Sequence, residues 1–257
     1  MSPGRRGLTI VIIAGVLAGS ACLSDDPTIT AGSATATTTL AVGSGTGRPS
    51  SETTSDTPTP PTTAPLLATT TTPRPRVVHE QAHAPFAFVG GVTLLHPSDR
   101  VERVGFHEAN HDGARQMEIA ATAAAPFVME TRDRPTGSRT AADVVVDPDR
   151  PIRSPVSGTV RRAGSYVLYC DYSDDFVVIE PDDHPGWEVK LLHIDGVAVT
   201  LGERVEAGVT LLAPRPTRLA FESQVEEDTA TPPWPHVHIE VVDPEIPDIP
   251  DPDGGCP

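Results

Sequence analysis

The stretch Trp234-Pro235-His236-Val237-His238-Ile239-Glu240-Val241 lies close to the C-terminus and has the alternation of a β-strand. Side chains two residues apart on a strand point to the same face, so we expect His236 and His238 to project side by side, about 7 Å apart. Two imidazoles on one rigid strand can share a metal site, or can serve as one metal ligand and one general base. An exposed strand also carries such a pair without any function, so the rest of the chain has to distinguish these interpretations.

The sequence from residue 77 to residue 257 predicts one all-β domain. Its apolar segments are short, rich in Val, Ile and Tyr, and separated by clusters of Gly, Pro and Asp. About 180 residues are enough for one domain with a core of its own. Only Ala120 to Ala125 has clear helical propensity, and this stretch is short. The expected strands are residues 92–95, 101–106, 142–146, 158–162, 166–169, 176–179, 188–193, 209–213 and 236–242.

Residues 1–22 have the composition of a bacterial export signal. Arg5 and Arg6 precede an apolar run from Leu8 to Ala18, which is too short for a comfortable membrane span. Small residues directly before Cys22 predict cleavage there and acylation of Cys22, as in a bacterial lipoprotein. We therefore expect an exported protein, held at the outer face of the cell membrane by a lipid; simple secretion to the wall or the medium is the alternative.

Residues 23–76 are dominated by Thr, Ser, Pro, Gly and Ala. Such a segment cannot bury enough apolar surface to offset the entropy lost on ordering. The composition predicts a disordered tether of the kind that is often O-glycosylated, with a reach of about 40 Å as a flexible coil. A tether of this length suits a domain that works at a distance from a membrane, inside a cell wall.

The net charge of the chain narrows the choice of binding partners. The formal net charge of −16 argues against binding to nucleic acid and against attraction to anionic membrane surfaces, so a membrane is expected to be reached only through a lipid anchor.

If Cys22 is acylated, Cys170 and Cys256 remain as candidates for a disulfide, which export would permit. Two unrelated thiols are the alternative.

Two glycine-containing segments, Ser154–Val160 (SPVSGTV) and Gly202–Val209 (GERVEAGV), are typical of sandwich barrels of the biotinyl or lipoyl kind and of larger folds built on the same hybrid motif. A biotinyl or lipoyl carrier needs a lysine at the tip of a hairpin between these segments. The lysine in this interval, Lys190, lies within a strand-like run instead. The larger folds therefore agree better with the sequence.

Together with Leu191-Leu192-His193-Ile194 and Pro235–Glu240, these segments make the chain resemble the lysostaphin/LytM-type zinc endopeptidases, which cleave peptide bonds in peptidoglycan. The pattern of that family runs His-x-Gly-x-Asp, a GTV turn, a YxHL-like strand and a final PHLHFE-like strand. The resemblance covers residues 139–242. It implies a duplicated hybrid motif, a β fold like a barrel-sandwich hybrid, with zinc as cofactor and with peptidoglycan or a cell-wall hydrolase as partner.

The resemblance also implies site residues. Counting back without gaps from the GTV turn aligns Asp143 with the metal-binding aspartate of the family. Asp143 and His238 are then the expected zinc ligands, and His193 and His236 the catalytic residues beside the attacking water. The same alignment places Arg139 where the first histidine ligand belongs. Because a catalytic zinc usually has three protein ligands and a guanidinium repels a cation, this alignment predicts a degenerate site.

Two other sources of the missing ligand remain open. The run His111-Asp112-Gly113-Ala114-Arg115 keeps the His and Gly of the first motif, but loses its Asp and lies far upstream of the GTV turn. Alternatively, His107 or His111, four residues apart in an expected polar loop, supplies the ligand by folding over the site. The remaining histidines are expected at the surface: His79, His83, His96 and His184.

Three functions follow from these observations. The first is a tethered, non-catalytic LytM-type domain that binds cell-wall peptide or regulates a wall hydrolase. The second is an active zinc endopeptidase that recruits a substitute third ligand. The third is a non-enzymatic surface lipoprotein whose histidines are incidental, and this one requires that His193, His236, His238 and Asp143 do not converge.

Overall fold

The computed structural model describes residues 74–80 and 82–249. The predicted export signal with Cys22, nearly all of the predicted tether, and Cys256 lie outside the described residues. Cys170 lies in the turn between two strands, and its pairing with Cys256 stays a prediction. In the part of the chain that the structure describes, no helix is both long enough and apolar enough to cross a membrane.

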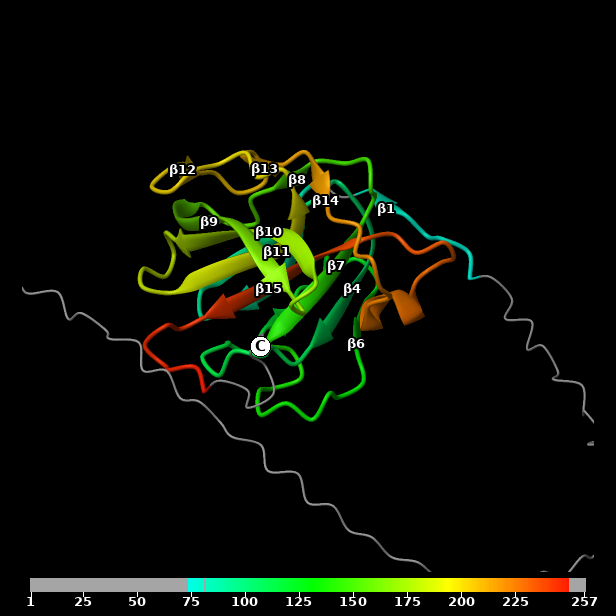
Figure 1. Ribbon diagram of the computed structural model, residues 1–257, viewed down its shortest axis with the longest axis horizontal. Helices are drawn as coiled ribbons and strands as arrows, with labels where there is room; N and C mark the ends of the chain where they lie inside the picture. The colour runs from blue at the N-terminus through cyan, green and yellow to red at the C-terminus, as the bar shows by residue number, and fades with distance from the viewer. Residues whose placement is uncertain (1–73, 81, 250–257) are drawn as a thin grey trace, which may run out of the picture. The chain divides into compact units, whose positions relative to one another are not determined.

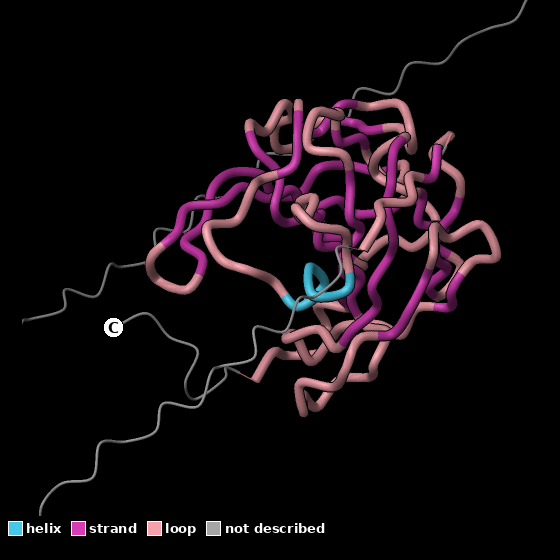
Figure 2. The backbone as a smooth tube through the Cα atoms, turned by 90° about the vertical axis from the view of Figure 1, so that its right-hand side faces the viewer, coloured by secondary structure: helices cyan, strands magenta, loops and turns pink. Residues whose placement is uncertain are grey.

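The described part is built almost entirely of β-strands, which confirms the predicted all-β class (Figure 1). Figure 2 shows strands and loops throughout this part, with a single short helical segment, η1 (Gln224–Asp228). The strands are β1 (His79–Glu80), β2 (Pro85–Val89), β3 (Val92–Leu95), β4 (Arg100–His107), β5 (Glu118–Ile119), β6 (Pro126–Val128), β7 (Ala141–Val146), β8 (Ile152–Arg153), β9 (Gly158–Leu168), β10 (Tyr172–Pro181), β11 (Glu188–Asp195), β12 (Arg204–Val205), β13 (Leu211–Ala213), β14 (Arg215–Pro216) and β15 (His236–Val242).

One large sheet dominates the architecture. Its strand order is β1-β4-β7-β15-β11-β10-β9-β12, with β6 paired to β4 and β14 paired to β11. All of these pairings are antiparallel except that of β4 with β6. The strand that carries His236 and His238, β15, lies between β7 and β11 in the middle of the sheet (Figure 1).

The central strands alternate between two buried faces. Val237, Ile239 and Val241 of β15 pack in the main hydrophobic core, with the alternate residues of β7 beside them. Burial of each such side chain contributes about 1.5–3 kcal/mol to folding. The opposite face of β15 carries His236, His238 and Glu240. The period of two read from the sequence therefore separates a core face from a polar face, as expected.

The predicted strand boundaries differ from the structure mainly in the hairpin of β9 and β10. Residues 158–162 and 166–169 were expected as separate strands, but β9 runs without interruption through Gly164. The chain reverses instead at Tyr169 and Cys170, which both have positive φ (49° and 62°). In the glycine-containing segment Gly202–Val209, Gly202 and Gly208 have φ of 83° and 71°, a region that favours residues without a Cβ.

Two expectations from the sequence are wrong: the helical propensity of residues 120–125 and the surface position of His96. Residues 120–125 form turns and no helix, because six residues give too few hydrogen bonds to offset helix nucleation. His96 is fully buried and not at the surface. Its Nδ1 lies 2.6 Å from the carbonyl oxygen of Ala84, and its Nε2 accepts the N–H of Ala124 at 3.1 Å. Burial lowers its pKa to about 4, so this ring is a neutral structural bridge.

Candidate metal centre

Three neighbouring strands place three ligand-type side chains on one face of the sheet. Asp143 of β7 lies directly opposite His238 of β15 and, on its other side, opposite Gly105 of β4. His107 follows Gly105 by two residues on the same strand, so its side chain points to the face that carries Asp143. The residue opposite His107 is Ala141, whose methyl group leaves room for an imidazole ring.

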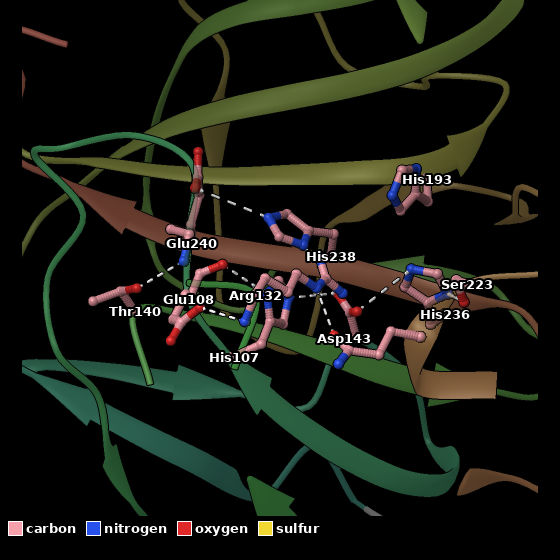
Figure 3. A network of polar contacts seen from close by, with 12 residues as sticks. His107, Glu108, Arg132, Thr140, Asp143, His193, Ser223, His236, His238 and Glu240 are labelled. Atoms are coloured by element: carbon pink, nitrogen blue, oxygen red, sulfur yellow. Dashed lines mark hydrogen bonds and ion pairs between the residues drawn. The ribbon is translucent and has the colours of Figure 1, made fainter. Parts of the chain in front are cut away.

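The ligand atoms of these side chains converge (Figure 3). Nε2 of His107 lies 3.2 Å from Oδ1 of Asp143, and Nδ1 of His238 lies 2.9 Å from the same oxygen. All three ligand atoms lie within 4.8 Å of one another. His107 and Asp143 are buried, and His238 is half-buried. Two imidazoles and one carboxylate on a rigid sheet are a donor set that zinc accepts.

The hydrogen bonds around His107 favour a cation at this point. Nδ1 of His107 lies 2.9 Å from the carbonyl oxygen of Glu108, which can only accept, so Nδ1 carries a proton. In the neutral ring, Nε2 then presents a lone pair to the Asp143 carboxylate, an arrangement that needs a proton or a metal ion between the two atoms. Four tetrahedral ligands of zinc are about 3.3 Å apart, close to the separations found here. The residues present therefore fit a zinc ion.

A second set of contacts is made by Nε2 of His238, the ring nitrogen that does not face Asp143. Nε2 of His238 lies 3.9 Å from Oε2 of Glu240, and the same carboxylate forms an ion pair of 3.1 Å with Lys190. Carboxylates in this position orient a ligating imidazole and raise its basicity. Neither Glu240 nor Lys190 was expected in the site, although the spacing of Glu240 after His238 places it on the same strand face.

The two predicted substitutes for the missing ligand have different positions. His107 belongs to the convergent group, whereas His111 lies on the cavity wall outside it. Nδ1 of His111 accepts the N–H of Gly113 at 3.0 Å and lies 3.9 Å from the carboxylate of Asp248. Arg139, at the position that the family pattern assigns to the first ligand, is half-buried and does not line the cavity.

His193 reaches the site through an irregularity of its strand. Asp175 pairs with Ile194 and the next residue, Phe176, pairs with Leu192, so His193 is an extra residue that bulges out of the ladder. Its φ of 64° lies in the left-handed region, which is uncommon for a residue with a side chain. A bulge re-aims the side chain it carries, here towards the cavity.

The orientation of His193 is fixed by a buried carboxylate that sequence reasoning missed. Oδ2 of Asp174 lies 2.7 Å from Nδ1 of His193 and also accepts the backbone N–H of that residue at 3.1 Å. The hydroxyl of Tyr166 donates to the same oxygen at 2.7 Å. Burial opposes ionisation of Asp174, but the hydrogen bonds from His193 and Tyr166 hold its pKa below the ordinary value.

His236 completes the group. Its Nε2 lies 3.8 Å from Oδ2 of Asp143, its Nδ1 lies 3.4 Å from the hydroxyl oxygen of Ser223, and its ring centre lies 4.9 Å from that of His193. Burial lowers the pKa of His236 to about 3, against the opposing effect of the Asp143 charge. His236 is therefore a neutral imidazole at physiological pH.

The electrostatics of the candidate ligands follow from their contacts. Burial would raise the pKa of Asp143, but electrostatic interactions with the His107 and His236 rings and the hydrogen bonds with His107 and His238 keep it well below the usual value. Burial likewise opposes protonation of His238. The hydrogen bond to Asp143 and the proximity of Glu240 outweigh it and raise the pKa of His238 to about 9. Without metal, a proton holds this ring between two carboxylates.

A cavity of about 670 Å³ is lined by His107, Asp143, His193, His236 and His238, five of the residues predicted for the site. Arg132 and Arg134 line one wall, and Tyr169 and Phe221 line another. The floor is thus rich in histidine, and the walls carry cationic and aromatic groups. The arrangement can hold one divalent cation with two further imidazoles beside it.

Similarity to known proteins is found among solved structures. No family model matches the sequence, and no curated protein matches it. Among solved structures, the chain is similar to a zinc-containing peptidase from Vibrio cholerae, with a TM-score of 0.30 and 21% identity over 61% of this chain and 42% of that one. It is also similar to a peptidase M23 from Pseudomonas aeruginosa, with a TM-score of 0.28 and 17% identity over 62% of this chain and 82% of that one.

Both similarities are distant and concern the fold alone. The chain spans less than half the length of the Vibrio cholerae protein.

Proposed function

We propose that the domain is a zinc-dependent endopeptidase that cleaves peptide bonds in peptidoglycan. The observation that carries this proposal is the convergence of ligand atoms from His107, Asp143 and His238 on three adjacent strands. His193 and His236 lie in the same cavity, where they can act on a peptide bound at the metal. In this proposal His107 replaces the ligand that the family pattern places at residue 139.

A zinc ion held by these ligands would supply a Lewis acid that polarises the scissile carbonyl and activates water near neutral pH. The remaining chemistry belongs to the histidines. Because Asp174 accepts the Nδ1 proton of His193, Nε2 of this ring is free to take a proton from the attacking water. The same proton passes to the leaving amine when the C–N bond breaks. His236, as a neutral imidazole, can donate its N–H to the oxygen that becomes negative in the tetrahedral intermediate.

The two other functions have weaker support. The non-catalytic hypothesis depended on Arg139 at a ligand position, but Arg139 does not line the cavity and His107 lies within reach of the other ligands. The hypothesis of incidental histidines required dispersed side chains, and the four histidines and Asp143 are together in one cavity.

The proposal extends to the location of the enzyme. We propose that residues 1–22 direct export, that Cys22 is acylated, and that residues 23–76 tether the domain within the cell envelope. A disulfide between Cys170 and Cys256 would then fix the C-terminal tail to the hairpin of β9 and β10. The composition of these segments and the presence of three cysteines support these assignments.

The experiment that tests the function uses the full chain from residue 23, stripped of metal and reloaded with zinc. It is incubated with purified peptidoglycan, and newly exposed amino groups are labelled and counted. We expect zinc-dependent release that disappears in His193→Ala while zinc remains bound. His184→Ala is the matched control, because His184 stacks on Trp187 away from the cavity. A fully zinc-loaded protein that exposes no amino groups from any peptidoglycan cross-bridge type would refute the proposal.

A further inference from the structure

Two arginines on the cavity wall, Arg132 and Arg134, have no carboxylate partner within 4.0 Å among the described residues. Nine other arginines of the described part form an ion pair with an aspartate or glutamate. Carboxylates are abundant in a chain of net charge −16, yet neither of the two guanidinium groups in this cavity forms an ion pair with a described residue. Their position next to the candidate metal centre calls for a functional explanation.

A buried glutamate holds the loop that carries both arginines. Glu108 directly follows the candidate ligand His107, and its carboxylate accepts the hydroxyl of Thr131 at 2.5 Å and the backbone N–H groups of Arg132 and Arg134 at 2.8 and 3.3 Å. The carboxylate is thus used by the loop and its main chain, and neither guanidinium pairs with it. The loop is fixed relative to the metal ligands by these contacts.

The side chains of the two arginines are held by neutral groups. Arg132 donates from Nε to the side-chain oxygen of Gln224, and the amide Nε2 of Gln224 donates to the carbonyl oxygen of Glu130 at 3.0 Å. Arg134 donates from one Nη to the carbonyl oxygen of Glu108 at 2.8 Å. Within the described residues, both Nη groups of Arg132 and the second Nη of Arg134 have no hydrogen-bond acceptor. Each guanidinium is therefore positioned but keeps free N–H donors.

The charge environment of the two arginines favours the binding of an anion. Burial and then the charge of Arg132 lower the pKa of Arg134, so the two cations lie close enough to repel each other. Two guanidinium groups held together in a partly buried wall are stabilised by an anion that bridges them.

We propose that Arg132 and Arg134 form a subsite that binds a carboxylate of the peptide substrate. This inference rests on the proposed function, because it takes the substrate to be a peptide lying across the metal centre. The planar fork of a guanidinium matches the two oxygens of a carboxylate and forms charge-assisted hydrogen bonds with it. Since Glu108 links the arginine loop to His107, the subsite fixes the carboxylate at a set distance along the chain from the scissile bond. It selects peptides that carry a free carboxylate over those in which that group is amidated.

The test measures binding, which does not depend on cleavage. The probe is a fluorescent peptidoglycan stem pentapeptide with free carboxylates, compared with the same peptide after conversion of every carboxylate to a carboxamide. Affinities for both are measured by fluorescence anisotropy on the zinc-loaded full chain with His193→Ala, which holds the peptide uncut. We expect the free acid to bind at least about tenfold more tightly than the amide. The double variant Arg132→Gln/Arg134→Gln is expected to bind both peptides equally.

The matched control is Arg161→Gln, because Arg161 does not line the cavity and forms an ion pair with Glu180. It should keep the tenfold preference. Arg132→Gln alone guards against loss of structure, since the one hydrogen bond of its side chain to a described residue is to Gln224 and its backbone bond to Glu108 is kept. Zinc content is measured for each variant. The single variant Arg132→Gln should reduce the preference for the free acid several-fold while it retains zinc.

Equal affinity of the parent chain for the two peptides, or a preference that survives in a zinc-loaded double variant, would overturn the inference. Displacement of both peptides by millimolar inorganic phosphate, without any difference between acid and amide, would assign the subsite to a phosphoryl group and also overturn it. If the free acid is preferred but wild type cuts no peptide bond, the subsite stands and the proposed function fails.

Discussion

His107 and Asp143 lie on neighbouring antiparallel strands, with Nε2 of the histidine 3.2 Å from Oδ1 of the aspartate. A pattern that places both ligands on one strand needs a histidine four residues before the aspartate. In this chain the adjacent strand β4 supplies the imidazole, over the small residue Ala141. The register between β4 and β7 therefore determines whether the site has two protein ligands or three.

Replacement of His107 by alanine is expected to abolish tight zinc binding. One imidazole of three donors is lost, and we expect affinity to fall on the order of 100-fold or more. Zinc affinity is measured by competition with a chromophoric chelator. The matched control is His111→Ala, which lies on the same cavity wall outside the ligand group and should keep its zinc. Loss of zinc from the His111 variant, with retention in the His107 variant, would reverse the assignment.

Replacement of Arg139 by alanine is expected to leave zinc binding and peptide cleavage within about twofold of wild type. Its side chain does not line the cavity, and its main-chain carbonyl, which accepts the N–H of Met117 at 2.8 Å, is unaffected by the substitution. Zinc titration and the amino-group assay check this. A large gain in zinc affinity in Arg139→Ala would instead mean that the guanidinium suppresses the site, as the degenerate alignment predicted.

The sequence predicted which side chains lie on the polar face of β15 better than it predicted how the strands pair. The alternation of β15 followed from periodicity, because a strand fixes the face on which each side chain lies. Asp143 followed only from aligning the chain with the motifs of the family that it resembles. The role of His107 could only be left open, since the pairing of β4 with β7 joins residues far apart in the chain. Asp174 was missed because it acts through a β-bulge at His193, and a bulge changes the register without a clear sequence signal.

Replacement of Asp174 by asparagine is expected to lower kcat on the order of 100-fold while zinc content stays unchanged. The amide cannot stabilise a protonated His193, and it can hold the ring in the wrong tautomer. Tyr166→Phe should have a smaller effect, because the phenol only donates to Asp174. Asp175→Asn is the control, since Asp175 accepts the backbone N–H of Gly196 instead. Equal losses in the Asp174 and Asp175 variants would indicate a structural effect of the strand and no positioning of His193.

Zinc binding is expected to release about one proton from His238 at pH 7. The pKa of this ring is raised to about 9 in the metal-free protein, above the ordinary value of about 6.5, whereas a metal ligand must be neutral. The stability that the protonated ring gives the metal-free protein is complete below about pH 6.5 and is lost as pH rises through about 9. Zinc therefore binds more tightly as pH rises across the same window, by up to about tenfold per pH unit.

Calorimetric titration with zinc at pH 7, in buffers of different ionisation enthalpy, counts the protons released, and a repeat at pH 10 should find none from His238. Glu240→Gln removes one of the contacts that raise the pKa of His238, so this variant should release fewer protons at pH 8 than the wild-type protein does. The same count at pH 7 and pH 10 would show that His238 does not exchange its proton for the metal, and would remove it from the ligand set.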